Sequence, residues 1–342
     1  MWRASPIFYD DMTEDKGSDP MTRPSIFVTR RWPAPAEEAL SAHFDVTFND
    51  NDRPLSKGDL MAGFASHDIA APTVSDVIDA DVVNAGGEGR CRMIANYGVG
   101  VNHIDLAAAA AQGMAVSNTP GVLTDATADL TLTLMLMLSR RAGEGERELR
   151  AGAWSGWRPT HLVGRQMTGK TLGIIGMGRI GQAVARRAHY GFGMEVVFQN
   201  RSTIADGAGL GARQLASVAE VCAASDYVSL HCAATPETRH ILGAEALGAM
   251  SPDAYVINTA RGDVVDEAAL VAALETGAVA GAGLDVFQGE PVVNPAILNA
   301  PNTVLLPHLG SATQETRVAM GLKVVENARA FAAGTALPDP VG

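Results

Sequence analysis

The segment that decides the fold is Lys170-Thr171-Leu172-Gly173-Ile174-Ile175-Gly176-Met177-Gly178-Arg179-Ile180-Gly181. Its apolar run is short and rich in branched residues, which indicates a buried strand. Gly176, Gly178 and Gly181 then form the pattern G-x-G-x-x-G. In a dinucleotide-binding fold these glycines permit a tight turn, close approach of the pyrophosphate and close packing of the next helix. Because a strand precedes the glycines and a helical pattern follows them, the segment favours a nucleotide site over a plain tight turn.

Strand-like and helical segments alternate along the rest of the chain. Before the glycine-rich segment we expect five strands, at residues 25–29, 45–48, 69–74, 92–97 and 114–117. From the glycine-rich segment onward we expect six, at residues 171–175, 195–199, 227–232, 254–259, 281–287 and 303–307. Such alternation is typical of parallel sheets covered by helices on both faces. The sequence therefore predicts a small α/β unit followed by a complete dinucleotide-binding domain.

The length and composition fit two soluble domains. The chain has 342 residues, of which 47% are apolar and 19% are charged, so it can bury a full core. Its net charge of -12 argues against nucleic acid or an anionic membrane surface as a partner. The three cysteines are scattered, which fits a reducing cytosol, and we expect a cytoplasmic protein.

Two further segments bear on location and assembly. Residues 1–21 are polar and acidic, and we expect a flexible N-terminal extension without a secretory signal. Residues 130–138 are apolar but too few to span a bilayer. They belong to a long periodic helix expected over residues 125–141, which can pack in the core or between two subunits.

Chemically active side chains are expected where the strands of the second domain end, because ligands of open α/β sheets bind there. Arg261, Asp285, Glu290 and His308 all follow such strands. Arginine can hold a carboxylate with two hydrogen bonds, and histidine can transfer a proton near neutral pH. A carboxylate beside that histidine would stabilise its protonated form. This set suits the reduction of an anionic carbonyl compound.

Each of these residues also has a structural alternative. Arg261 could serve an ordinary ion pair, and Glu290, before Pro291, could be a turn residue. His231 is expected inside a strand as a structural residue with its hydrogen bonds satisfied. Together with Cys232 it forms an isolated pair without further ligands, so no metal site is predicted.

The choice of cofactor depends on the residues after the second strand of the nucleotide domain. An acid there would bind the ribose of NAD, whereas an arginine accommodates the 2′-phosphate of NADP. The sequence Asn200-Arg201-Ser202 has no acid and contains an arginine. We therefore expect a preference for NADP(H), with use of NAD(H) possible.

The chain resembles the D-isomer-specific 2-hydroxyacid dehydrogenases across nearly all of residues 22–335. The resemblance is carried by the glycine-rich segment and by four further segments: Tyr97–Gly100 with Ile104-Asp105, Asn258–Gly262, Gly283–Phe287 with Glu290-Pro291, and Leu306–Ser311. The segment Val122–Asp129 is most similar to the glyoxylate and hydroxypyruvate reductases. The resemblance implies two Rossmann-like lobes, a flavodoxin-like substrate lobe and a doubly wound NAD(P)-binding lobe, with a cleft between them.

The resemblance also implies roles for individual residues. Arg261 would anchor the substrate, His308 would be the acid/base, and Glu290 would pair with His308. Backbone amides at Val99 and Gly100 would hold the substrate carboxylate together with Arg261 and His308. The implied cofactor contacts are Thr127, Gly176, Gly178, Arg179, Ile180, Gly181, Asn200, Arg201, Ser202, Cys232, Thr238, Thr259, Ala260, Arg261, Asp285, His308 and Gly310.

The resulting expectation is an oxidoreductase that reduces glyoxylate or hydroxypyruvate to the D-2-hydroxy acid with NAD(P)H. The substrate domain would comprise residues 22–120 and 309–342, and the dinucleotide-binding domain residues 121–308. The long helix would help to form a homodimer. Two alternatives stay open: an NAD(P)-sensing regulatory protein of the same fold, and a dehydrogenase of a larger 2-oxo acid.

Overall fold

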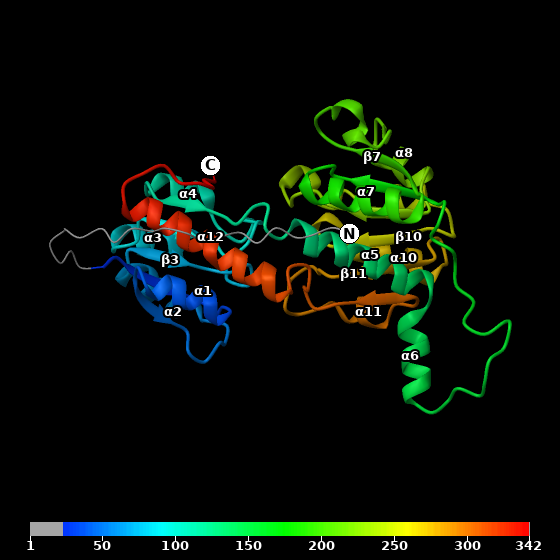
Figure 1. The fold of residues 1–342 in the computed structure, drawn as a ribbon, viewed down its shortest axis with the longest axis horizontal. Coiled ribbons are helices and arrows are strands. Elements are labelled where there is room, and N and C mark those ends of the chain that lie inside the picture. Colours follow the sequence, from blue (N-terminus) through cyan, green and yellow to red (C-terminus); the bar gives the residue numbers. More distant parts are fainter. Residues whose placement is uncertain (1–22, 342) are drawn as a thin grey trace, which may run out of the picture.

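The computed structural model describes residues 23–341, and Figure 1 shows two α/β lobes side by side. The predicted extension over residues 1–21 lies outside the described residues. The first lobe contains a parallel sheet in the order β2-β1-β3-β4-β5, which is the flavodoxin-like order. Its strands are β1 (Ser25–Val28), β2 (Asp45–Phe48), β3 (Ile69–Ala71), β4 (Met93–Ala95) and β5 (Ala115–Ser117). The prediction of a flavodoxin-like first lobe is confirmed.

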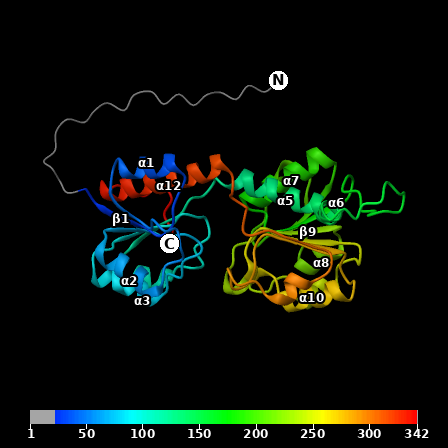
Figure 2. The same cartoon turned by 90° about the horizontal axis from the view of Figure 1, so that it is seen from below.

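Helices cover both faces of this first sheet (Figure 2). The helices are α1 (Ala34–Ser41) and α12 (Gln314–Ala332) on one face, α2 (Lys57–Ser66) and α3 (Ala80–Glu88) on the other, and α4 (Leu106–Ala111) before β5. Strand β1 shows why helices pack on both faces of the sheet. Its Ile26 and Val28 pack with α1 and α12, whereas Phe27 packs with α2 and α3. Successive side chains of a strand point to opposite faces, so both sets are buried.

The end of the chain returns to the first lobe. In Figure 2, α12 leaves the second lobe and lies beside α1. Beyond it, the N–H of Val341 donates to the carbonyl of Val116 in β5 at 2.8 Å. The first lobe is therefore assembled from the two ends of the described chain.

The second lobe contains a parallel sheet in the order β12-β11-β10-β9-β6-β7-β8. Its strands are β6 (Thr171–Ile175), β7 (Glu195–Gln199), β8 (Arg213–Gln214), β9 (Tyr227–Leu230), β10 (Tyr255–Asn258), β11 (Gly281–Leu284) and β12 (Thr303–Leu305). Six of these were predicted, and the seventh, β8, has only two residues and no apolar pattern. The sheet reverses its order at β6, which has β7 on one side and β9 on the other. This doubly wound arrangement confirms the predicted class of the second lobe.

Helices also cover both faces of the second sheet (Figure 2). One face carries α5 (Thr124–Ser139) and α7 (Arg179–Phe192), whose apolar residues pack with Leu172, Ile174 and Phe198. The other face carries α8 (Val218–Ala223), α9 (Ala244–Gly248) and α10 (Glu267–Glu275), with α11 (Pro295–Asn299) at the edge. Both faces of the strands are thus buried, which explains their continuous apolar sequences.

Two helices were not predicted. Helix α3 contains Gly86, where an added Cβ would lie 3.0–3.2 Å from the side chains of Met114, Cys91 and Phe64. Close tertiary packing therefore stabilises this helix in spite of its poor helix propensity. Helix α6 (Ala142–Arg150) follows α5 after Arg141, whose left-handed backbone (φ 50°) ends the predicted long helix.

The described residues contain neither a helix that could cross a bilayer nor a group of three His, Cys, Asp or Glu side chains suited to a metal ion. The cysteines are free, and burial raises the pKa of Cys91 to about 11 and that of Cys222 to about 12. The prediction of a reducing cellular compartment stays a prediction.

Candidate active site

A cleft of about 1510 Å³ lies between the two lobes. The first lobe contributes the loop Gly98–Val101, and the second contributes the ends of β9, β10, β11 and β12. The predicted site residues that line this cleft are Val99, Gly100, Thr127, Arg179, Ile180, Cys232, Thr259, Ala260, Arg261, Asp285, Glu290, His308 and Gly310. Segments far apart in the sequence are therefore brought to one place.

The glycine-rich turn has the geometry of a dinucleotide site. Gly176 has φ +96°, and an added Cβ would lie 2.6 Å from the backbone nitrogen of Cys232. A Cβ on Gly181 would lie 2.3 Å from the carbonyl oxygen of Gly176. At Gly178, by contrast, a Cβ would meet nothing within 4 Å, so this side of the turn is open. Helix α7 begins next to it at Arg179 without a side-chain cap, which leaves the first N–H groups of the helix for phosphate oxygens. The residues present therefore fit a dinucleotide.

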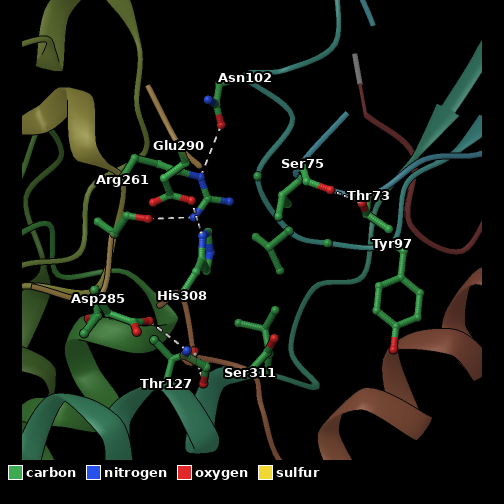
Figure 3. A pocket seen from close by; sticks show the side chains of 18 of the residues that line it. Thr73, Ser75, Tyr97, Asn102, Thr127, Arg261, Asp285, Glu290, His308 and Ser311 are labelled. Atoms are coloured by element: carbon green, nitrogen blue, oxygen red, sulfur yellow. Dashed lines mark hydrogen bonds and ion pairs between the residues drawn. The ribbon is translucent and has the colours of Figure 1, made fainter. Parts of the chain in front are cut away.

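His308 and Glu290 form a hydrogen-bonded pair in the cleft (Figure 3). The Nδ1 atom of His308 lies 2.7 Å from Oε2 of Glu290, and the other carboxylate oxygen accepts the N–H of Phe287 at 2.8 Å. Burial alone would raise the pKa of Glu290, but the hydrogen bond and the charge of His308 outweigh it and lower that pKa. Because Nδ1 is engaged, Nε2 is the nitrogen left to exchange a proton with a ligand.

Arg261 extends from the end of β10 toward the first lobe. Its Nε donates to Oδ1 of Asn102 at 3.2 Å, and its Nη1 donates to the carbonyl of Ala260 at 2.6 Å. A Cβ on Gly100 would lie 2.0 Å from Nη2, so the guanidinium packs directly on this glycine. Burial lowers the pKa of Arg261 and the charge of Glu290 raises it, and a guanidinium stays charged in such surroundings. A cation thus bridges the two lobes beside His308 (Figure 3).

Asp285 supports the turn that carries His308. It is 1% exposed, and its two carboxylate oxygens accept the N–H groups of Leu309 and Gly310 at 2.7 and 2.8 Å. Burial raises the pKa of Asp285 against these hydrogen bonds. Thr127 of α5 donates to the carbonyl of Gly310 at 3.2 Å. Asp285 and Thr127 therefore fix the backbone around His308, which itself has φ 55°.

Four predicted cofactor residues lie outside the lining of the cleft, as do the three glycines. Asn200 accepts the N–H of Met177 at 3.1 Å and donates to both the carbonyl and the hydroxyl of Ser202 at 3.0 Å. The side chains of Arg201 and Ser202 are exposed. Thr238 donates to the carbonyl of Ala233 at 2.6 Å in a short turn. Residues 200–202 therefore present an arginine and no carboxylate of their own.

The prediction that His231 lies inside a strand is wrong, because this residue lies just beyond β9. Its Nε2 lies 2.8 Å from the hydroxyl of Ser229, whereas its buried Nδ1 has no hydrogen-bond partner within residues 23–341. The expectation of satisfied hydrogen bonds is therefore wrong. Strand β9 ends where its neighbour Gly176 turns away, so the chain leaves the sheet earlier than the apolar pattern suggests.

Acid should destabilise the protein through two histidines. Burial lowers the pKa of His231 to about 3, and burial with the charge of Arg261 lowers that of His103 to about 4. Both pKa values are depressed below the unfolded value of 6.5, so the unfolded chain binds more protons between pH 4 and 6.5. We expect the free energy of unfolding to fall by about 2 kcal/mol per histidine between pH 7 and 5. Urea unfolding at pH 7 and pH 5 measures this decrease. In His231→Gln the free energy of unfolding should decrease by about half as much as in the wild type. An equal loss in wild type and variant would contradict this assignment.

Sequence reasoning missed the polar residues around the Gly98–Gly100 turn. These include Asn102, which accepts from Arg261, and Asn96 and His103, which bond to each other. The available signal was the cluster of amide and imidazole side chains on both sides of a glycine turn. Ser75 and Tyr97 also line the cleft from the first lobe (Figure 3).

Known proteins share both the sequence pattern and this architecture. Residues 132–310 match the family model described as D-isomer specific 2-hydroxyacid dehydrogenase, NAD binding domain. A glyoxylate reductase of Thermococcus litoralis is 39% identical over 323 residues, which cover 93% of this chain and 97% of the relative.

Two solved structures extend the comparison. A putative D-isomer specific 2-hydroxyacid dehydrogenase from Polaromonas sp. has a TM-score of 0.86 at 35% identity, covering 93% of this chain and 99% of the other. An NADPH-dependent glyoxylate/hydroxypyruvate reductase from Sinorhizobium meliloti, in complex with NADP and malonate, has a TM-score of 0.83 at 34% identity, covering 94% and 97%. The family predicted from the sequence is confirmed. The chain belongs to the D-isomer-specific 2-hydroxyacid dehydrogenases, the oxidoreductases that interconvert 2-oxo acids and D-2-hydroxy acids.

Proposed function

We propose that the protein is a glyoxylate/hydroxypyruvate reductase that prefers NADPH. The observation that carries this proposal is the presence of Arg261 and the His308–Glu290 pair in one cleft with Arg179 and Ile180, which begin the helix at the glycine-rich turn. The names of the relatives from Thermococcus and Sinorhizobium support the choice of substrates. We assign the substrate domain to residues 22–120 and 309–342, and the dinucleotide-binding domain to residues 121–308.

The side chains of the cleft have different roles in the reduction. Bound NADPH supplies the hydride. Arg261 and the N–H groups of Val99 and Gly100 hold the substrate carboxylate and thereby orient the carbonyl. His308 donates its Nε2 proton to the carbonyl oxygen, and Glu290 stabilises the protonated ring before transfer. Asp285 keeps the His308 turn in place and would help to orient the nicotinamide when the cofactor is bound.

Turnover of 2-oxo acids tests this function directly. Loss of absorbance at 340 nm should be observed with NADPH and glyoxylate or hydroxypyruvate. A higher kcat/KM for a longer 2-oxo acid would favour the alternative of a larger substrate. Tight NADPH binding without turnover of any 2-oxo acid would favour the regulatory protein instead.

The cofactor preference should depend on Arg201. We expect kcat/KM for NADPH to exceed that for NADH, because a guanidinium can pair with the 2′-phosphate. Glu237 lies close enough for Arg201 to contribute to the lowering of its pKa, and this acid would moderate the preference. Arg201→Ala should lower kcat/KM for NADPH about 10-fold and leave NADH nearly unchanged. Arg186→Ala, at an exposed site on α7, is the matched control. A wild-type preference for NADH would refute this part of the proposal.

We also propose a homodimer that forms through α5 and the segment after it. Leu136, Leu149, Trp154, Trp157 and Val163 are large apolar side chains that lie exposed in this region. Light scattering of the full chain measures the subunit number. A monomer at micromolar concentration would contradict this assignment.

A further inference from the structure

The loop Gly98–Val101 presents backbone N–H groups that nothing in the described chain uses. The N–H groups of Val99, Gly100 and Val101 donate no hydrogen bond to any acceptor among residues 23–341. The same loop lines the cleft, and Arg261 packs against Gly100. Free N–H groups beside a guanidinium form a site for an anion.

Every carbonyl of this loop, in contrast, has a donor. The Nδ2 atom of Asn96 donates to the carbonyls of Gly98 and Gly100, both at 3.0 Å. The Nδ2 atom of Asn118 donates to the carbonyl of Val99 at 2.9 Å. In a trans peptide the N–H points opposite to the preceding carbonyl. Asn96 therefore turns the N–H groups of Val99 and Val101 away from itself, and Asn118 does the same for Gly100.

His103 fixes the orientation of the Asn96 amide. Both carbonyls need a donor, so Nδ2 must face them and Oδ1 must face the opposite way. There Oδ1 lies 3.0 Å from Nε2 of His103, which must consequently carry the proton. Asn96 is fully buried, so its amide has little access to water and depends on these partners. The buried amide of Asn96 and the imidazole of His103 thus hold the conformation of this one short loop.

We propose that Asn96 and His103 are positioning residues for substrate: they hold the Gly98–Val101 loop with its N–H groups preorganised for the carboxylate of a 2-oxo acid. This inference rests on the proposed function. Neither side chain touches the substrate, because both act through the backbone. Their removal should therefore weaken binding of the carboxylate much more than binding of the cofactor.

Asn96→Asp is the decisive variant, because it keeps the shape but places a carboxylate against two carbonyls. We expect KM for glyoxylate, and the Kd of the substrate analogue oxamate in the presence of NADPH, to rise about 10- to 100-fold. The Kd of NADPH alone should stay within about twofold, because the glycine-rich turn lies in the other lobe. Steady-state kinetics and fluorescence titration measure these values.

Asn327→Asp is a matched control in the same lobe. Asn327 is also fully buried, its Nδ2 donates twice and its Oδ1 accepts once, but it lies in α12 away from the cleft. It should lower Tm without raising KM. His103→Phe keeps an aromatic ring but cannot donate to Asn96, so it should raise KM about 3- to 10-fold, and His103→Gln should recover part of this loss.

The outcomes separate the inference from the function on which it rests. A folded Asn96→Asp with wild-type KM and oxamate Kd would overturn the inference, as would an equal rise in KM for Asn327→Asp. If Asn96→Asp does not fold, a wild-type KM for His103→Phe overturns it. If the wild-type protein binds NADPH but reduces no 2-oxo acid, the proposed function fails before any variant is compared.

Discussion

His308→Ala is expected to lower kcat by about 10²- to 10⁴-fold, because the carbonyl oxygen then receives no proton from the protein. The ring is held by Glu290 at 2.7 Å in the cleft, and an alanine places no proton donor at this position. Cofactor affinity should change little, since the glycine-rich turn is elsewhere in the lobe. Stopped-flow measurement of NADPH oxidation and titration of NADPH fluorescence give the two quantities.

Two further variants test whether the loss of activity in His308→Ala is specific to the His308 side chain. His43→Ala, at an exposed position of the first lobe, should behave as wild type. Glu290→Gln keeps an oxygen acceptor for Nδ1 but loses the charge, so it should retain more activity than His308→Ala. Turnover of His308→Ala near the wild-type rate would remove this residue from the acid/base role.

Arg261→Lys is expected to lower kcat/KM by about 10²- to 10³-fold. A lysine cannot form the two parallel hydrogen bonds that a guanidinium offers to a carboxylate, and it cannot reach Asn102 with the same geometry. The loss should appear chiefly in KM, because the carboxylate is bound before and during reduction. Kinetics with glyoxylate as the varied substrate measures it.

Gly100→Ala tests the placement of the same guanidinium from the opposite lobe. The added methyl would overlap Nη2 of Arg261, so the guanidinium must move, and KM should rise about 10-fold.

Arg186→Lys, on the exposed side of α7, is the control for Arg261→Lys. A wild-type KM in Arg261→Lys would show that the carboxylate is bound elsewhere.

The second lobe could be predicted well because its strands are buried on both faces. Residues 171–175 and 195–199 were predicted to the residue, since a continuous apolar run bounded by glycine or polar residues has one interpretation. The four predicted strands after them were too long. At β9, β10, β11 and β12 the apolar pattern continues into the lining of the cleft, where the chain has already left the sheet.

The sequence predicted that Arg261, Glu290 and His308 lie together, and they line one cleft, but it did not predict the hydrogen bonds that hold the surrounding loops. Arg261, Glu290 and His308 follow strand ends, and that rule needs no coordinates. The bonds from Asn96 to the carbonyls of Gly98 and Gly100 depend on tertiary geometry, as does the approach of Asn102 to Arg261. Asparagine beside glycine is common in ordinary turns, so the local sequence alone does not distinguish a turn from a prepared anion site.

The return of α12 to the first lobe has a consequence for biosynthesis. Strands β6 to β12 and the helices between them come from one uninterrupted segment, so the nucleotide lobe can close while the ribosome still holds the C-terminus. The five strands made earliest must wait, because Met320 and Val324 of α12 and the pairing of Val341 with β5 arrive last. Until then the nascent chain exposes the part of the apolar face of its first sheet that α12 later covers, so this lobe is most prone to aggregation before synthesis is complete.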